Sequence, residues 1–190
     1  MVVAYHVFLS FRCLDTRLGF TRNLYNALNE KGIQTFINDE ELQRGDQITP
    51  ALMKAIEKSR IAIVALSTNY ASSFCLHEPI PILHCSKSTG LLVLPVFYEL
   101  NPSDMRHQNG SYGDALAKHE KRLKHYMDRL QKWKEALSQV ADLSGYHFRK
   151  GDGYEYKYIK KIVEQVSKAI SPASLHGVDY QVGLSQECYK

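Results

Sequence analysis

Charged and polar residues follow each of four short apolar runs in this sequence. They lie in segments 11–17, 38–46, 67–78 and 99–104, which together contain arginines, carboxylates and a few aromatic side chains. In an open parallel sheet, the segments that follow the strands meet at one edge, and ligands bind there. Arginine can contact phosphate through two parallel hydrogen bonds. The pattern therefore predicts a site for an anionic ligand that carries a polar sugar.

Common signatures of other chemistries are absent. There is no GxGxxG and no GxxxxGK[ST], which disfavours a dinucleotide redox enzyme and a P-loop ATPase. A phosphorelay receiver needs an aspartate at the end of the third strand, where residues 67–69 read Ser-Thr-Asn. The Cys and His residues at 75–77 and 84–85 lack metal-ligand spacing, so no metal site is assigned. Residues 72–73, a Ser-Ser pair, lack the GxSxG turn of a nucleophilic serine.

Four runs have the composition of β-strands. They are residues 6–12, 33–37, 61–66 and 91–98, with the sequences HVFLSFR, IQTFI, IAIVAL and LLVLPVFY. The last two are almost wholly apolar, as a parallel strand covered on both faces must be. Residues 146–148 predict a further, short edge strand.

Helical periodicity separates these runs. Apolar residues recur at steps of three and four in four segments, 20–28, 48–56, 111–143 and 159–170. Three of these segments are followed by a residue that stops helices, namely Gly32, Gly145 or Pro172. Because strands and helices alternate, the sequence predicts an α/β fold in which helices cover both faces of a parallel sheet.

The composition is that of a globular domain. The 190 residues are 44% apolar and 23% charged, which excludes a disordered chain. The longest apolar run, residues 91–98, is far shorter than the roughly 20 residues of a membrane-spanning helix. The net charge of +4 disfavours a nucleic-acid partner. The basic residues of segment 118–134 are interpreted as lying on the solvent-exposed faces of helical structure. The buried stripe of that structure would consist of Leu123, Tyr126, Met127, Leu130, Trp133 and Leu137.

The cysteines and the N-terminus indicate a reducing compartment. Cys13, Cys75, Cys85 and Cys188 have wide, irregular spacing and do not form a disulfide framework. The N-terminus lacks a basic leader and a cleavage site, and it is interpreted as a buried strand. We therefore expect a soluble protein of the cytoplasm or nucleus with no membrane partner.

Four long segments, in order, resemble a plant TIR (Toll/interleukin-1 receptor-type) domain. HVFLSFRCLDTRLGFTRNLYNAL is similar to the family's opening FLSFRGxDTRxxFxxxLxxAL, and GIQTFINDEELQRGDQI to its second strand and following loop. SRIAIVALSTNYASSFCLHE resembles the third strand and the SxWCLxE helix start, and LPVFYELNPSDMRHQNGSYGDAL resembles the PVFYxVxPSDVRxQxGSY segment. The resemblance covers residues 5–170. It implies a flavodoxin-like three-layer fold with a five-stranded parallel sheet.

The resemblance also implies an enzyme that cleaves the nicotinamide–ribose bond of NAD⁺ when TIR domains assemble. Nicotinamide and ADP-ribose, or cyclic and related forms, would be the products, and NAD⁺ would be a substrate rather than a cofactor. Glu78 falls on the motif glutamate, whose carboxylate would stabilise an oxocarbenium-like ribosyl centre. The resemblance likewise implies that the substrate-binding residues are Phe11, Arg12, Asp15, Thr16, Arg17, Gly19, Phe74 and Cys75. Phe74 would offer an aromatic face on which the adenine stacks.

Each of these residues also has a structural interpretation. Phe11 points inward on a strand and can be core. Asp15 and Arg17 can form a helix cap and an ion pair. Cys75 can be a small buried residue, and Glu78 an exposed helical carboxylate.

The chain departs from the family pattern at several positions, one of which is Arg22-Asn23 on the first helix, where the family often has Ser-His. Cys13 replaces a glycine, Phe74 replaces a tryptophan, and Pro79 and Pro81 follow Glu78 directly. Proline inside a helix removes a hydrogen bond and costs about 3 kcal/mol, and it pushes the preceding residue out of helical geometry. We therefore predict a bent or delayed helix here and reduced NAD⁺ cleavage, which leucine at position 79 should restore. The alternative function is a TIR–TIR interaction module that associates through helix surfaces.

The C-terminal residues complete the expected organisation. DYQVGL resembles the linker that leads into the nucleotide-binding domain and leucine-rich repeats of plant immune receptors. We expect a TIR domain over residues 1–171 and a tail over 172–190, in a TIR-only or truncated disease-resistance protein. Its expected role is plant immune signal transduction.

Overall fold

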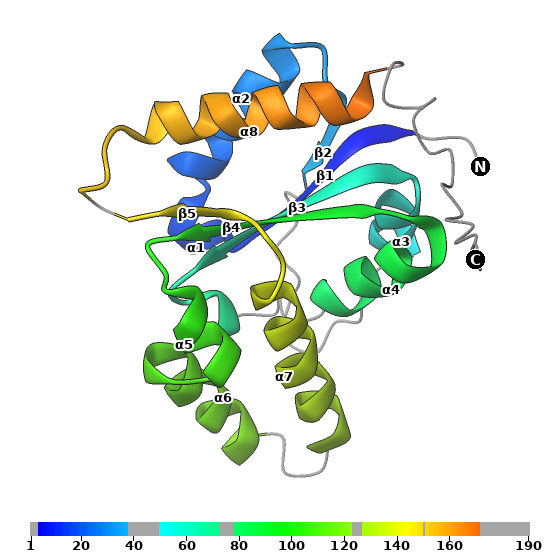
Figure 1. Cartoon of the computed structure of the whole chain (residues 1–190). Helices are drawn as coiled ribbons and strands as arrows, with labels where there is room; N and C mark the ends of the chain where they lie inside the picture. Colours follow the sequence, from blue (N-terminus) through cyan, green and yellow to red (C-terminus); the bar gives the residue numbers. More distant parts are fainter. Residues whose placement is uncertain (1–3, 38–49, 73–77, 123–126, 150, 172–190) are drawn as a thin grey trace, which may run out of the picture.

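A five-stranded sheet forms the centre of the described structure (Figure 1). This computed structural model describes residues 4–37, 50–72, 78–122, 127–149 and 151–171. The strand order is β2-β1-β3-β4-β5, and every neighbouring pair is parallel. This is the flavodoxin-like order, so the predicted fold class is confirmed. The elements are β1 (Tyr5–Phe11), α1 (Cys13–Thr16), α2 (Phe20–Glu30), β2 (Thr35–Ile37), α3 (Pro50–Glu57), β3 (Ser59–Ser67), η1 (Tyr70–Ser72), α4 (Pro79–Thr89), β4 (Leu92–Tyr98), α5 (Pro102–His107), α6 (Gly110–Arg122), α7 (Met127–Ala141), β5 (Tyr146–Phe148) and α8 (Glu155–Ile170).

Helices cover both faces of the sheet and create two cores. α2 and α8 lie above the sheet in Figure 1, and α3 to α7 lie below it. The central strand β3 supplies side chains to both cores: Ile61, Ile63 and Ala65 pack toward α2 and α8, whereas Ala62, Val64 and Leu66 pack toward the other layer. Each large aliphatic side chain contributes roughly 1.5–3 kcal/mol when it is buried. Because both faces of β3 are covered, its sequence is apolar at successive positions rather than at alternate ones.

All predicted strands are present. Their ends differ by at most two residues from the ranges expected from the sequence. The predicted stop of the first long helix is also confirmed, because Gly32 follows α2 with φ +70° and its N–H donates to the Asn29 carbonyl at 2.8 Å.

Two short helices were not predicted, and one apolar stripe is shorter than expected. α1 and α5 span only one or two turns, too few for a periodic pattern. α5 has a local signal instead, since the Asn101 side chain accepts a hydrogen bond from the Ser103 N–H at 3.0 Å and Pro102 follows at the first helical position. In α7, Leu130, Trp133 and Leu137 are buried as predicted, but Met127 is 48% exposed. Its position at the first residue of α7 explains this difference.

Some expectations fall outside the described residues. Residues 172–190, predicted as a tail, are among these, so the domain boundary at 171 stays a prediction. Within the part of the chain that is described, no helix combines the length and apolarity required to cross a lipid bilayer.

Tyr98 ends β4 and links the sheet to α8. Burial, the hydrogen bond that its hydroxyl donates to Glu155 Oε2 at 3.0 Å, and the charges of Glu155 and Glu99 raise the pKa of Tyr98 from 10.0 to about 12. The folded state therefore keeps this proton at a pH where the unfolded chain loses it. The contribution of Tyr98 to the free energy of unfolding is therefore fully present below about pH 10 and is lost as the pH rises to about 12.

We expect Tyr98→Phe to weaken this alkaline loss of stability. The variant keeps the ring but has no proton to release, so its free energy of unfolding should fall less steeply than that of the wild type between about pH 10 and 12. Urea unfolding at several pH values in this interval measures both slopes. Parallel slopes would contradict the assignment.

Candidate functional site

The carboxyl ends of β1, β3 and β4 lie close together at one edge of the sheet. The register pairs Phe11 with Ala65 and Ser67 with Tyr98. α1, η1 and α5 follow these strands at this edge (Figure 1). The predicted convergence is therefore confirmed for the segments after these three strands, whereas residues 38–49, after β2, are not described.

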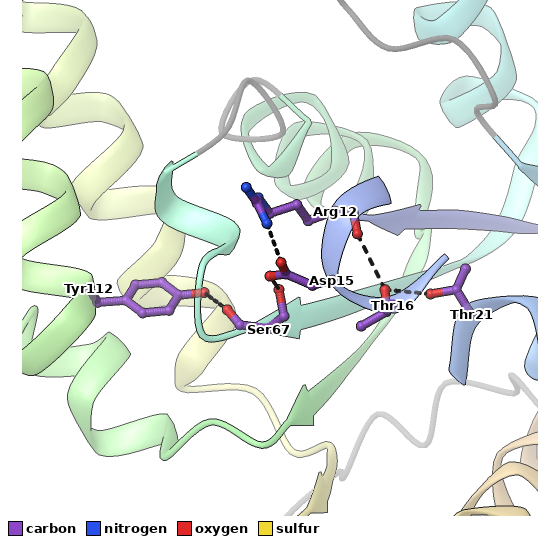
Figure 2. A network of polar contacts seen from close by, with 6 residues as sticks. All are labelled: Arg12, Asp15, Thr16, Thr21, Ser67 and Tyr112. Atoms are coloured by element: carbon purple, nitrogen blue, oxygen red, sulfur yellow. Dashed lines mark hydrogen bonds and ion pairs between the residues drawn. The ribbon is translucent and has the colours of Figure 1, made fainter. Parts of the chain in front are cut away.

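Asp15 lies at the centre of a polar network at this edge (Figure 2). Its Oδ1 accepts a hydrogen bond from Nη1 of Arg12, and its Oδ2 accepts one from the Ser67 hydroxyl at 2.5 Å. The Arg12 and Asp15 side chains are only 17% and 15% exposed. Solvent screens such a pair less than a surface ion pair, so Asp15 holds the Arg12 guanidinium in one orientation.

Buried tyrosines support the strand ends next to this pair. The Tyr112 hydroxyl, from α6, donates to the Ser67 carbonyl at 3.0 Å (Figure 2), and the Tyr70 and Ser10 hydroxyls lie 3.0 Å apart in a hydrogen bond. Both tyrosines are fully buried. Buried polar groups that are hydrogen-bonded make a local arrangement rigid.

Two buried threonines order the turn between β1 and α2. The Thr16 hydroxyl donates to the Arg12 carbonyl at 3.5 Å and accepts from the Thr21 hydroxyl at 2.7 Å (Figure 2). The turn ends at the exposed Gly19, whose N–H donates to the Thr16 carbonyl at 3.2 Å and whose carbonyl accepts from the Asn23 N–H at 3.0 Å. Thr16 thus positions the turn, and Gly19 is the N-cap residue directly before α2.

The remaining candidate substrate-binding residues lie in the core, in the turn that holds Asp15, or outside the described residues. Phe11 is 4% exposed and packs in the core beneath α2 and α8, as its structural interpretation predicts. Arg17 is half-buried in the same turn as Asp15. Phe74 and Cys75 lie outside the described residues, so their contact with a substrate, like that of Phe11, stays a prediction.

Glu78 lies at the N-terminus of α4 and is 4% exposed. Its interpretation as an exposed helical carboxylate is therefore wrong. Glutamate is seldom buried to this extent. The partial positive charge at a helix N-terminus favours a carboxylate there, and low solvent access strengthens the attraction between that carboxylate and a nearby cation.

Pro79 and Pro81 occupy the first turn of α4, not its interior. The helix begins at Pro79, which confirms the predicted late start. Glu78 has φ −72° and ψ −39°, so the prediction that Pro79 pushes it out of helical geometry is wrong. The Glu78 carbonyl accepts a hydrogen bond from the Ile82 N–H at 3.2 Å. N–H groups of a first turn have no intrahelical partner, so these prolines remove no helical bond.

We therefore expect little gain from leucine at position 79. Pro79→Leu should not raise the free energy of unfolding, because a proline in the first turn removes no helical bond and its replacement frees the unfolded chain, at a cost of about 0.4–1 kcal/mol. Pro102→Leu, at the corresponding position of α5, is the matched control. Urea unfolding compares both variants with the wild type. A gain near 3 kcal/mol for Pro79→Leu alone would show that this proline does strain the helix.

Ser67, Thr21, Tyr70 and Tyr112 belong to the network but were not predicted as functional. Ser67 has a sequence signal, because it is a polar residue at the end of an apolar strand. Its partner Asp15 is 52 positions away, and no local pattern identifies such a pair. Among the described residues, no three His, Cys, Asp or Glu side chains gather closely enough to hold a metal ion.

Comparison with known families gives a match over most of the chain. A family model described as TIR domain matches residues 4–182. The chain is 43% identical over 185 residues to Disease resistance protein RPV1 of Vitis rotundifolia, with 94% of this chain and 13% of the relative covered. It is 40% identical over 188 residues to TMV resistance protein N of Nicotiana glutinosa, with 98% of this chain and 16% of the relative covered. The chain thus spans less than a fifth of the length of either relative.

A solved structure has the same fold at similar identity. It is described as the activated Roq1 resistosome directly recognizing the pathogen effector XopQ, in its TIR domains. The TM-score is 0.79 and the sequence identity 48%, with 85% of this chain and 99% of the solved chain covered. The likeness therefore extends to the sequence as well as to the fold.

Proposed function

Since this chain belongs to the TIR domain family, we propose that it cleaves the nicotinamide–ribose bond of NAD⁺. The bond between ribose C1′ and the pyridinium nitrogen breaks, and nicotinamide leaves with the bonding electron pair. Water then adds to C1′ and loses a proton, which gives ADP-ribose. An internal nucleophile of the same molecule gives a cyclic product instead. NAD⁺ is consumed, so it is a substrate and not a cofactor.

The burial of Glu78 is the observation that carries this proposal. As the C1′–N bond breaks, positive charge develops on the ribose ring. A carboxylate that water does not solvate stabilises such a charge more strongly than an exposed one. Glu78 is 4% exposed and precedes α4 in the segment that follows β3, the strand whose last residue, Ser67, bonds to Asp15.

The Arg12–Asp15 pair supplies the complementary part of the site. The Arg12 guanidinium carries five N–H donors, and its fork matches the oxygens of a diphosphate. Asp15 engages Nη1 and holds the plane of the guanidinium. We propose that Arg12 binds the anionic diphosphate of NAD⁺, while Thr16 and Gly19 give the turn its shape.

The names of the relatives point to a biological setting. Both curated relatives are named as resistance proteins of plants. We propose that this domain acts in plant immune signal transduction in the cytoplasm or nucleus, and that cleavage begins when copies of the domain assemble. The buried free thiol of Cys85 is compatible with a reducing compartment.

Nicotinamide release tests the proposal. Purified protein should release nicotinamide from NAD⁺, and the rate per molecule should rise when a crowding agent or a surface concentrates the protein. ADP-ribose or a cyclic form should appear in equal amount. No release under these conditions, together with binding to another TIR domain, would instead support an interaction module.

A further inference from the structure

Ser67 is a buried polar residue that the proposed reaction leaves without a role. It ends β3 and is 3% exposed. Its hydroxyl donates to Asp15 Oδ2 at 2.5 Å, and its carbonyl accepts from the Tyr112 hydroxyl at 3.0 Å (Figure 2). Ser67 is thus hydrogen-bonded to the β1–α2 turn through its side chain and to α6 through its backbone carbonyl.

The position of Ser67 is itself fixed by the fold. It pairs with Tyr98 in the parallel register between β3 and β4, at the middle of the sheet. Tyr112, which bonds its carbonyl, is fully buried against η1 and the sheet. The hydroxyl of Ser67 is therefore a donor at a defined point of the site edge, unlike a donor on a surface loop.

This donor determines which oxygen of Asp15 is available to Arg12. A carboxylate has two oxygens, and the one held by Ser67 leaves the other for Nη1 of Arg12. The Arg12 Nε atom is buried and has no hydrogen-bond partner within the described residues. The guanidinium thus keeps a donor that its pair with Asp15 does not use.

We infer that Ser67 is a positioning residue for the substrate site: through Asp15 it orients the Arg12 guanidinium toward the anionic part of NAD⁺. This inference rests on the proposed function. Ser67 does not touch the substrate. Without its hydroxyl, the Asp15 carboxylate can rotate, and Arg12 no longer presents its donors in one direction.

Ser67→Ala tests the inference against a matched control on the same strand. Ser59→Ala removes a buried serine hydroxyl at the opposite end of β3, where it donates to the Ala55 carbonyl at 2.7 Å. We expect Ser67→Ala to raise the KM for NAD⁺ about tenfold while kcat stays within about threefold, and Ser59→Ala to change neither. Ser67→Thr, which keeps a hydroxyl, should recover most of the loss.

Binding of ADP-ribose separates this inference from the proposed reaction. ADP-ribose contains the diphosphate but no bond to cleave, so its Kd by calorimetry does not depend on catalysis. Ser67→Ala should weaken it about tenfold, and Tyr112→Phe should weaken it less, in the same direction. Wild-type protein that binds ADP-ribose without releasing nicotinamide would overturn the proposed function alone. Equal Kd values for Ser67→Ala, Ser59→Ala and the wild type, or no binding by the wild type, would overturn the role of Ser67.

Discussion

Replacing Glu78 with glutamine should lower the rate of nicotinamide release about 100-fold or more. The amide has nearly the same shape as the carboxylate but carries no charge, so it cannot stabilise the positive charge that develops on the ribose. Because the side chain at this position is only 4% exposed, solvation by water cannot compensate for the missing negative charge. The effect should appear in kcat, since the missing interaction is stronger in the transition state than in the bound substrate.

Two measurements separate this effect from a loss of folding or of binding. Thermal unfolding should show that Glu78→Gln remains folded, and calorimetry should give an ADP-ribose Kd within about threefold of the wild type. Glu57→Gln is the matched control, because Glu57 is an exposed carboxylate at the end of α3, before β3 begins. A folded Glu78→Gln protein with wild-type kcat would contradict the catalytic role of this residue.

The sheet and its strands could be predicted because the physical signal is continuous along the chain. β3 is buried on both faces, and eight of its nine residues are buried. A strand in that environment must be apolar at successive positions, which is a pattern that few other structures require. The order of the strands, by contrast, was available only through the family resemblance. Alternation of strands and helices does not specify which strands are neighbours.

The start of α4 was harder to predict because the effect of a proline depends on its distance from the helix end. With a helix that begins near residue 73, Pro79 removes an internal hydrogen bond. With a helix that begins at Pro79, as observed, the same ring has the φ that a first turn requires. Glu78 was identified from the motif, but its burial could not be, since burial of a single carboxylate leaves no local pattern.

The network around Asp15 shows a second limit. The sequence suggested an ion pair between Asp15 and Arg17, whereas the carboxylate of Asp15 pairs with Arg12, three residues before it. Ser67 and Tyr112 join that pair only because β1 and β3 are neighbours and α6 packs against η1. Such residues become visible once the topology is known, which is why the positioning role of Ser67 follows from the structure and not from the sequence.

Gly145→Ala should destabilise the domain by about 3 kcal/mol, at the upper end of the usual cost of overpacking. Gly145 lies immediately before β5, and a Cβ atom there would stand 2.2 Å from the Pro95 carbonyl oxygen and 2.7 Å from its Cγ. Both neighbours belong to β4, which is paired on its two sides and cannot move alone. The backbone before β5 would have to retreat, although the Glu99 N–H donates to the Phe148 carbonyl at 2.7 Å in the present arrangement.

Urea and thermal unfolding measure this cost. For a domain of this size, about 3 kcal/mol corresponds to a fall in Tm of roughly 6–12 °C. Ser144→Ala is the control, since Ser144 is the exposed neighbour and already has a Cβ, and its effect should stay within about 0.5 kcal/mol. If both variants unfold like the wild type, β5 can shift away from Pro95 without cost, and the edge of the sheet beside Tyr98 is less rigid than its hydrogen bonds imply. A large loss for Gly145→Ala alone means that close approach to Pro95 is what requires glycine at the α7–β5 turn.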